Sequence, residues 1–223
     1  MTAVLPPSAT TTGPRSVRLL TRFEDGERLH ALLWRAGPGW RMISSAVLGG
    51  GIGERDWVLN AQVAHGYRRT DPDRHLAELA AGAGATGPGV GLMTAADVSR
   101  PGRARDGGAE AVVTAGISVR GWAATPAEGT AQPGTINIVA VLPVALTDAA
   151  LVNAVATATE AKVQALLDAG HDCSGTPTDA VCVASRTPAP GTPLHPFAGP
   201  RSPWGARLAR AVHRAVGEAV ATG

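Results

Sequence analysis

Short apolar-rich runs separated by glycine-bearing turns follow one another in the first third of the chain, a pattern typical of β-strands. Two apolar-rich runs, 17–23 and 28–35, flank the turn sequence Glu24-Asp25-Gly26-Glu27. A short glycine-bearing turn between two such runs predicts a β-hairpin. A third strand is predicted at 40–47, and residues 57–67 fit either a strand or a short helix.

Later segments of the chain contain both strand-like and helical patterns. Strands are predicted within 89–98 and at 109–119, 135–142 and 179–185, whereas the Arg/Gly/Asp-rich stretch 99–108 is expected to be an exposed loop. Helical runs follow Asp71-Pro72-Asp73, extend from Thr147 to Gly170, and occupy about 202–221. Strands dominate early and helices late, so the fold class predicted is α+β: one mixed, largely antiparallel sheet covered by helices.

The long helix has clear end signals. Thr147 is a plausible N-cap, and Gly170 can close the helix at its C′ position. Its packing face is predicted from four apolar positions at helical spacing: Val152, Val155, Val163 and Leu166. Beside this face runs a polar stripe: Asn153, Thr157, Glu160 and Gln164. In the last helix, the predicted buried positions are Leu208, Val212, Ala215, Val216 and Ala219.

Length and charge narrow the class of protein. A chain of 223 residues with 44% hydrophobic content can bury a full core, and we expect one domain over 17–223 after a disordered tail at 1–16. The formal net charge of +2 is spread without runs of one sign, which argues against nucleic-acid binding. The longest apolar stretch, 138–146, is too short for a bilayer span. The N-terminus lacks secretory-signal features, so a cytoplasmic protein is expected.

A glycine cluster follows the third strand in SSAVLGGGIG, residues 44–53. It is not a P-loop, because the only lysine of the chain is Lys162, and its spacing does not fit a dinucleotide-binding loop. Two interpretations remain: a tight turn without a ligand, or backbone that closely approaches a ligand.

The two cysteines, Cys173 and Cys182, lie near His171. Their spacing lacks the close pairs of a structural zinc site, so no metal site is predicted. Reduced, partly buried thiols are expected instead.

Eight short motifs, in this order, carry a resemblance to a known family: SSAVLGGGIG, NAQVAHGY, GLMTAADV, TAGIS, GTINI, ATEAK, SGTPTDAV and FAGPRSPWG. Together they resemble the adenosylcobinamide amidohydrolases of cobalamin salvage, the CbiZ group. Two positions depart from the expected pattern: Ser174 stands where threonine is expected, and Phe197 stands where tyrosine is more usual.

The resemblance implies hydrolysis of the amide that joins the corrin side chain to aminopropanol in adenosylcobinamide, giving adenosylcobyric acid. The partner would be a small-molecule corrinoid, and no cofactor is expected because the substrate carries the cobalt. A non-catalytic corrinoid carrier is the alternative, although the D-x-H-x-x-G motif of the usual carriers is absent from the 223 residues.

Amide hydrolysis needs an activated nucleophile, an oxyanion site and a proton for the leaving nitrogen. Asp179, after a Gly-Thr-Pro-Thr turn, is the candidate base, with Thr176 and Thr178 able to hydrogen-bond to it or to a water molecule. An Asx turn would explain Asp179 equally well. Glu160 is a second candidate acid or base, while Lys162 is expected to be solvated. Asn137, inside an apolar strand, either holds a loop or contacts substrate.

A covalent serine mechanism at Ser44 or Ser45 is a weaker alternative, since no G-x-S-x-G elbow is present and attack by water is favoured. None of the lone histidines at 65, 171, 195 and 213 is assigned a role. Binding of a rigid macrocycle calls for close backbone approach. Substrate contacts are therefore predicted at the two serines, at Gly49, Gly50 and Gly51, and at Asn60, Tyr67 and Thr178; Tyr67 fits a core position equally well.

Overall fold

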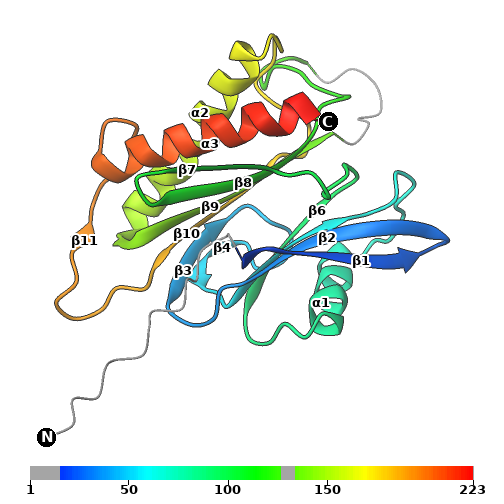
Figure 1. Cartoon of the computed structure of the whole chain (residues 1–223), viewed down its shortest axis with the longest axis horizontal. Helices are drawn as coiled ribbons and strands as arrows, with labels where there is room; N and C mark the ends of the chain where they lie inside the picture. The colour runs from blue at the N-terminus through cyan, green and yellow to red at the C-terminus, as the bar shows by residue number, and fades with distance from the viewer. Residues whose placement is uncertain (1–15, 127–133, 223) are drawn as a thin grey trace, which may run out of the picture.

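The computed structural model describes residues 16–126 and 134–222. The predicted tail, residues 1–16, lies outside this range apart from Ser16. The described chain forms four layers, with a helix, two facing sheets and two further helices (Figure 1). The α+β class and the largely antiparallel pairing are confirmed, but the strands divide over two sheets where the sequence indicated one.

The first sheet has the order β1 (Arg18–Glu24), β2 (Glu27–Arg35), β5 (Trp57–Gln62) and β6 (Gly89–Thr94). The predicted hairpin is confirmed: Glu24 pairs with Glu27, and Asp25 and Gly26 both have positive φ, as a two-residue type I′ turn requires. Helix α1 (Pro72–Gly82) covers the outer face of this sheet, where Leu76 and Ala80 pack against β2 and β5.

The second sheet has the order β4 (Gly51–Glu54), β3 (Trp40–Ser44), β10 (Ala180–Arg186), β9 (Thr135–Leu146), β8 (Ala109–Gly116) and β7 (Gly102–Asp106), and β11 (Leu194–His195) also pairs with β9. The two sheets face each other across a buried apolar layer. In this layer the rings of Trp34 and Trp40 meet edge to face at 5.2 Å.

Strand β7 corrects the prediction of an exposed loop at 99–108. It is an edge strand, with Arg103 and Arg105 on its exposed side, so its polar alternation resembles that of a loop. Asp106 fixes its end by ion pairs with Arg210 and Arg214.

Helices α2 (Asp148–Asp168) and α3 (Pro203–Thr222) cover the outer face of the second sheet. Both end signals of α2 are confirmed: the Thr147 hydroxyl accepts from Ala150 N at 3.1 Å, and Gly170 has φ +83°. The predicted packing face of α2 is confirmed in part: Leu166 is buried and Val155 packs against the core, but Val152 is exposed. The face that packs on the sheet and α3 is built mainly from small residues: Ala150, Ala154, Ala158, Ala161 and Ala165. Small side chains let the helices approach closely.

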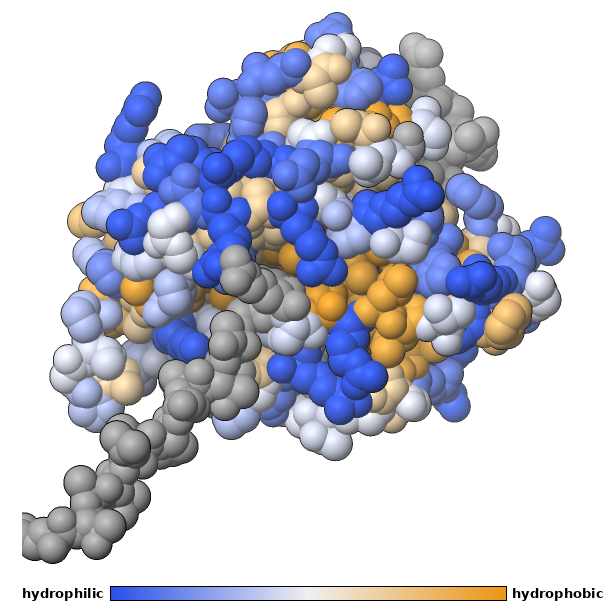
Figure 2. Space-filling model, viewed as in Figure 1, coloured by the Kyte–Doolittle hydropathy of each residue, from blue (hydrophilic) through white to orange (hydrophobic). Residues whose placement is uncertain are grey.

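Hydrophilic residues gather over much of the face in Figure 2, and an apolar area interrupts them near β1 and β2. Leu19 and Phe23 of β1 are 48% and 79% exposed. None of the described helices combines the length and apolar character needed to cross a bilayer. The expectation of a cytoplasmic protein stays a prediction.

Both cysteines are free, as expected, and they are fully buried where the sequence predicted partial burial. Burial raises the pKa of the Cys182 thiol to about 12. Because the thiolate is the reactive form, we expect neither Cys173 nor Cys182 to react with a thiol reagent in the native protein at neutral pH. Both should react after denaturation, as mass spectrometry would measure. Rapid modification of native protein would contradict this burial.

Candidate functional site

Two hollows meet at Asp179, beside the first residues of β9 and β10. The first, of about 420 Å³, we call the tyrosine hollow. Its walls are apolar, with polar groups contributed by Ser45, His65, Tyr67, Thr94, Thr135, Thr178 and Asp179. The second, of about 670 Å³, we call the lysine hollow; its lining includes Trp122, Thr159, Lys162, Ser174, Thr176 and Asp179. Both volumes fall in the range of small-molecule sites, roughly 300–1,000 Å³.

Asp179 is held by four hydrogen-bond donors from three parts of the chain. Oδ1 accepts from the backbone N–H of Ile136 at 2.8 Å and from the Thr176 hydroxyl. Oδ2 accepts from Lys162 Nζ at 2.5 Å and from the backbone N–H of Thr176 at 3.3 Å. The contacts within 176–179 are those of the predicted turn, while those from β9 and α2 fix the carboxylate in space. Asp179 is therefore a positioned carboxylate at the wall between two hollows.

The prediction of a solvated Lys162 is wrong. Lys162 is 7% exposed and forms an ion pair with Asp179. Its stem lies on the alanine-rich face of α2, where it joins Ala158 and Ala161. The signal that could have located it is this run of alanines at helical spacing, which marks the centre of the buried face of α2. One of its three ammonium donors is used by Asp179 among the hydrogen bonds of the described residues.

Gly175 makes the contact between Lys162 and Asp179 possible. A Cβ at this position would collide with both Asp179 Oδ2 and Lys162 Nζ, so the backbone lies directly against the ion pair. The neighbouring Ser174 joins this turn to the 117–126 segment, since its hydroxyl accepts from Ala123 N at 2.8 Å. These contacts form one wall of the lysine hollow.

Of the other predicted catalytic residues, Thr176 joins Asp179 in the lysine hollow, but Glu160 and Asn137 line neither hollow. Glu160 lies exposed on α2 and lines neither hollow. Asn137 is fully buried between the sheets, where Nδ2 donates to Asn60 Oδ1 at 2.8 Å and to the Met93 carbonyl at 3.1 Å. Asn60 in turn donates to Thr114 at 2.9 Å. Both asparagines therefore connect strands, and Asn60 is 4% exposed with no place in the lining of either hollow.

The two predicted serines have different surroundings. The Ser44 hydroxyl is buried; it donates to the Val181 carbonyl at 3.0 Å and accepts from Ala46 N at 3.0 Å. The Ser45 hydroxyl accepts from Val181 N at 3.0 Å and lines the tyrosine hollow. Neither serine has a hydrogen bond to a histidine in the described part of the chain. A serine–histidine nucleophile is therefore not preformed here.

The glycine cluster packs against the protein itself. Gly49 has φ +69°, and a Cβ there would occupy the place of the Gly89 carbonyl in β6. The adjacent Leu48 pairs with Gly91 through backbone hydrogen bonds in both directions. None of Gly49, Gly50 and Gly51 lines either hollow. The glycines thus hold the 45–47 segment, which does line the tyrosine hollow, against the first sheet.

Tyr67 and Thr178, also predicted as substrate contacts, line the tyrosine hollow with Ser45 and Asp179. The Thr178 hydroxyl lies 2.5 Å from that of Thr135. Tyr67 is half-buried, and its hydroxyl hydrogen-bonds with His75 Nδ1 at 3.1 Å. Burial raises the pKa of Tyr67, with a smaller contribution from the Asp71 and Glu24 carboxylates and an opposing one from Arg69. The phenol therefore keeps its proton at neutral pH.

The chemistry available here is acid–base chemistry. The tyrosine hollow offers a carboxylate, a phenol and several hydroxyls, and the lysine hollow adds an ammonium group. Within residues 16–126 and 134–222, no three His, Cys, Asp or Glu side chains gather in a way that could hold a metal ion. Of the residues in the two hollows, the sequence predicted roles for Ser45, Tyr67, Thr176, Thr178 and Asp179. It missed Lys162, and it missed His75, which hydrogen-bonds with Tyr67.

Comparisons with known proteins agree with the family resemblance carried by the eight sequence motifs. The sequence profile of the adenosylcobinamide amidohydrolase family, CbiZ, matches residues 16–223. An adenosylcobinamide amidohydrolase of Methanosarcina mazei is 33% identical over 178 residues, which cover 77% of this chain and 86% of that protein. One from Halobacterium salinarum is 46% identical over 86 residues, 39% of this chain and 36% of that protein.

Proposed function

Because this chain belongs to the adenosylcobinamide amidohydrolase family, we propose that it hydrolyses the amide between the corrin side chain and aminopropanol in adenosylcobinamide. The products are adenosylcobyric acid and free aminopropanol, and the acid returns to cobalamin synthesis. The observation that carries the proposal is Asp179, a carboxylate fixed by four donors and exposed to two hollows inside the segment that the family profile covers.

The nucleophile is a water molecule activated by Asp179. A carboxylate offers about four acceptor positions, and four donors already occupy them. Water must therefore displace one donor. The Thr176 hydroxyl is the one that can rotate away without moving the backbone. Lys162 remains on Oδ2 from the side of the lysine hollow and balances the charge of the carboxylate.

The tyrosine hollow accommodates the aminopropanol arm, while the macrocycle covers its mouth. Its wall is largely apolar, and the exposed side chain of Val47 at this wall offers an apolar contact to the macrocycle. Ser45 and Thr178 supply hydroxyls for the polar end of the arm. The cobalt belongs to the substrate, and the absence of a cofactor of the enzyme's own stays a prediction.

We expect purified protein incubated with adenosylcobinamide to release aminopropanol and adenosylcobyric acid in equal amounts, because hydrolysis of one amide yields one of each. Mass spectrometry of the products measures both. A heat-denatured sample is the control for spontaneous hydrolysis. Tight corrinoid binding without aminopropanol release would favour the carrier alternative, and absence of both binding and release would overturn the proposal.

A further inference from the structure

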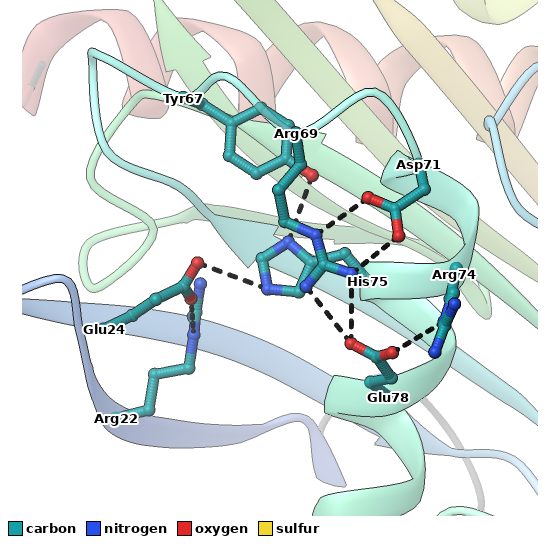
Figure 3. Close-up of polar contacts among 8 residues, drawn as sticks. All are labelled: Arg22, Glu24, Tyr67, Arg69, Asp71, Arg74, His75 and Glu78. Carbon is teal, nitrogen blue, oxygen red and sulfur yellow. Dashed lines mark hydrogen bonds and ion pairs between the residues drawn. The ribbon is translucent and has the colours of Figure 1, made fainter.

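A line of three side chains leads from the surface of the first sheet to the tyrosine hollow (Figure 3). Glu24 Oε1, at the end of β1, lies 3.3 Å from Nε2 of His75 on α1. His75 Nδ1 lies 3.1 Å from the hydroxyl of Tyr67, and the two rings stack with an interplanar angle of 8°. Tyr67 lines the hollow that also contains Asp179. The sequence did not single out Glu24 or His75.

The ring nitrogens of His75 are shielded from bulk water and need hydrogen-bond partners within the protein. His75 is 4% exposed, and a buried imidazole is costly unless both nitrogens have partners. Here a carboxylate faces one nitrogen and a phenol the other. A carboxylate that faces Nε2 can accept a hydrogen bond from a proton on that nitrogen, and this contact orients the ring toward Tyr67.

Glu24 is itself fixed. Its Oε2 accepts from Arg22 Nε at 2.8 Å, and Arg22 is anchored on the Gln62 carbonyl at 2.5 Å. Oε1 is therefore left to face His75.

Other charges near His75 are paired among themselves. Arg69 hydrogen-bonds with Asp71 and Glu78, and Arg74 with Glu78. The bond from Arg69 lowers the pKa of Asp71 to about 2, so this carboxylate is ionised at neutral pH. The charged and titratable groups that surround His75 come from β1, the 67–71 segment and α1: Arg22, Glu24, Tyr67, Arg69, Asp71, Arg74 and Glu78.

The protonation of His75 decides what Tyr67 offers to the hollow. When only Nε2 carries a proton, Nδ1 accepts the hydroxyl proton of Tyr67, and the phenol oxygen acts as an acceptor toward a ligand. When both nitrogens are protonated, Nδ1–H donates to the phenol oxygen. The hydroxyl proton of Tyr67 is then free for a ligand in the hollow.

We propose that Tyr67 is the general acid of the reaction and that Glu24 and His75 are positioning residues. Glu24 holds His75 in place, and His75 replaces the proton that Tyr67 gives up. The proposal rests on the proposed function. As the carbon–nitrogen bond of the tetrahedral intermediate breaks, the nitrogen takes the hydroxyl proton of Tyr67, and Tyr67 takes the Nδ1 proton of His75. Water supplies the oxygen of the new carboxylate, and solvent returns the proton to His75. Asp179 and Tyr67 thus act from the same hollow, one as base and one as acid.

Kinetics of Tyr67→Phe test the proton transfer. The change keeps the ring and removes the hydroxyl, so kcat should fall by about 10²-fold or more, with little change in KM. The affinity for adenosylcobyric acid, which is not turned over, should stay within about twofold of that of the wild-type protein. A role only in binding would instead raise KM and weaken product binding while leaving kcat unchanged, and that result would overturn the proposal.

Two charge-matched variants separate the positioning role from the surrounding charges. Glu24→Gln and Glu78→Gln each remove one negative charge from the same cluster, but only Glu24 faces His75. We expect Glu24→Gln to lower kcat with little change in KM, because an amide accepts from Nε2 more weakly than a carboxylate and orients the imidazole ring less firmly. Glu78→Gln should leave both unchanged. Equal effects of the two variants would overturn the positioning role.

A spectroscopic readout is independent of turnover. Tyr67 is the only tyrosine of the chain, so the near-ultraviolet absorbance of tyrosinate reports its ionisation alone. Glu24 raises and Arg69 lowers the pKa of Tyr67. Glu24→Gln should therefore lower this pKa, and Arg69→Gln should raise it. If wild-type protein releases no aminopropanol, the proposed function fails; if it does and Tyr67→Phe keeps its kcat, only the general-acid proposal fails.

Discussion

Asp179→Asn is expected to lower the rate of aminopropanol release by about 10²- to 10⁴-fold, the usual contribution of a general base. The amide keeps the shape of the carboxylate and can still accept from Ile136 N and Thr176, but it cannot take a proton from water. The measurement is single-turnover release of aminopropanol from adenosylcobinamide. A variant that folds and turns over at the wild-type rate would remove Asp179 from the mechanism.

The same change also affects stability, and this effect needs its own control. Asparagine leaves the buried ammonium group of Lys162 unpaired, and loss of one partner of a buried pair costs about 3–5 kcal/mol. The double variant Asp179→Asn/Lys162→Met removes both charges and should recover part of the lost free energy of unfolding. It should not recover turnover. Recovery of activity together with stability would show that Asp179 acts only through the fold.

Gly49→Ala is expected to be among the most destabilising single-methyl additions in the chain. Gly51→Ala is the matched control, because Gly51 also has positive φ, at +80°, but no atom within 4 Å of the added Cβ. The backbone conformation alone should cost roughly 1–2 kcal/mol at either position. At Gly49 the methyl must also displace the Gly89 carbonyl, and such overpacking adds about 1–3 kcal/mol. Urea denaturation of the two variants measures the difference.

The Gly49→Ala and Gly51→Ala variants also test whether the glycine cluster serves packing or substrate binding. If Gly49 serves packing, as the contact with Gly89 indicates, then Gly49→Ala loses stability while the remaining folded protein keeps its KM for adenosylcobinamide. A variant of wild-type stability that no longer binds the corrinoid would contradict this. It would restore the hypothesis, made from the sequence, that the glycines contact the macrocycle.

The local sequence pattern predicted correctly those elements whose turns and helix caps depend on residues close together in the chain. The β1–β2 hairpin follows from the Asp25-Gly26 turn, and α2 begins and ends where Thr147 and Gly170 predict. Strand β7 was missed because an edge strand with exposed arginines has the composition of a loop. The packing face of α2 was predicted only in part, at Leu166 and Val155, because large apolar side chains were expected to mark its centre. Close helix packing instead buries alanine and leaves Val152 exposed.

The sequence by itself determined the α+β class, the family, and four residues that the structure brings to one hollow: Ser45, Tyr67, Thr178 and Asp179. Only the tertiary structure decided that Lys162 is buried against Asp179, that Gly49 packs on Gly89, and that Glu24 and His75 stand behind Tyr67. Turns, caps and periodicity depend on residues a few positions apart. The Lys162–Asp179, Gly49–Gly89 and Glu24–His75 contacts join residues 17 to 51 positions apart, and no local pattern records which distant side chain will fill the space beside a given group.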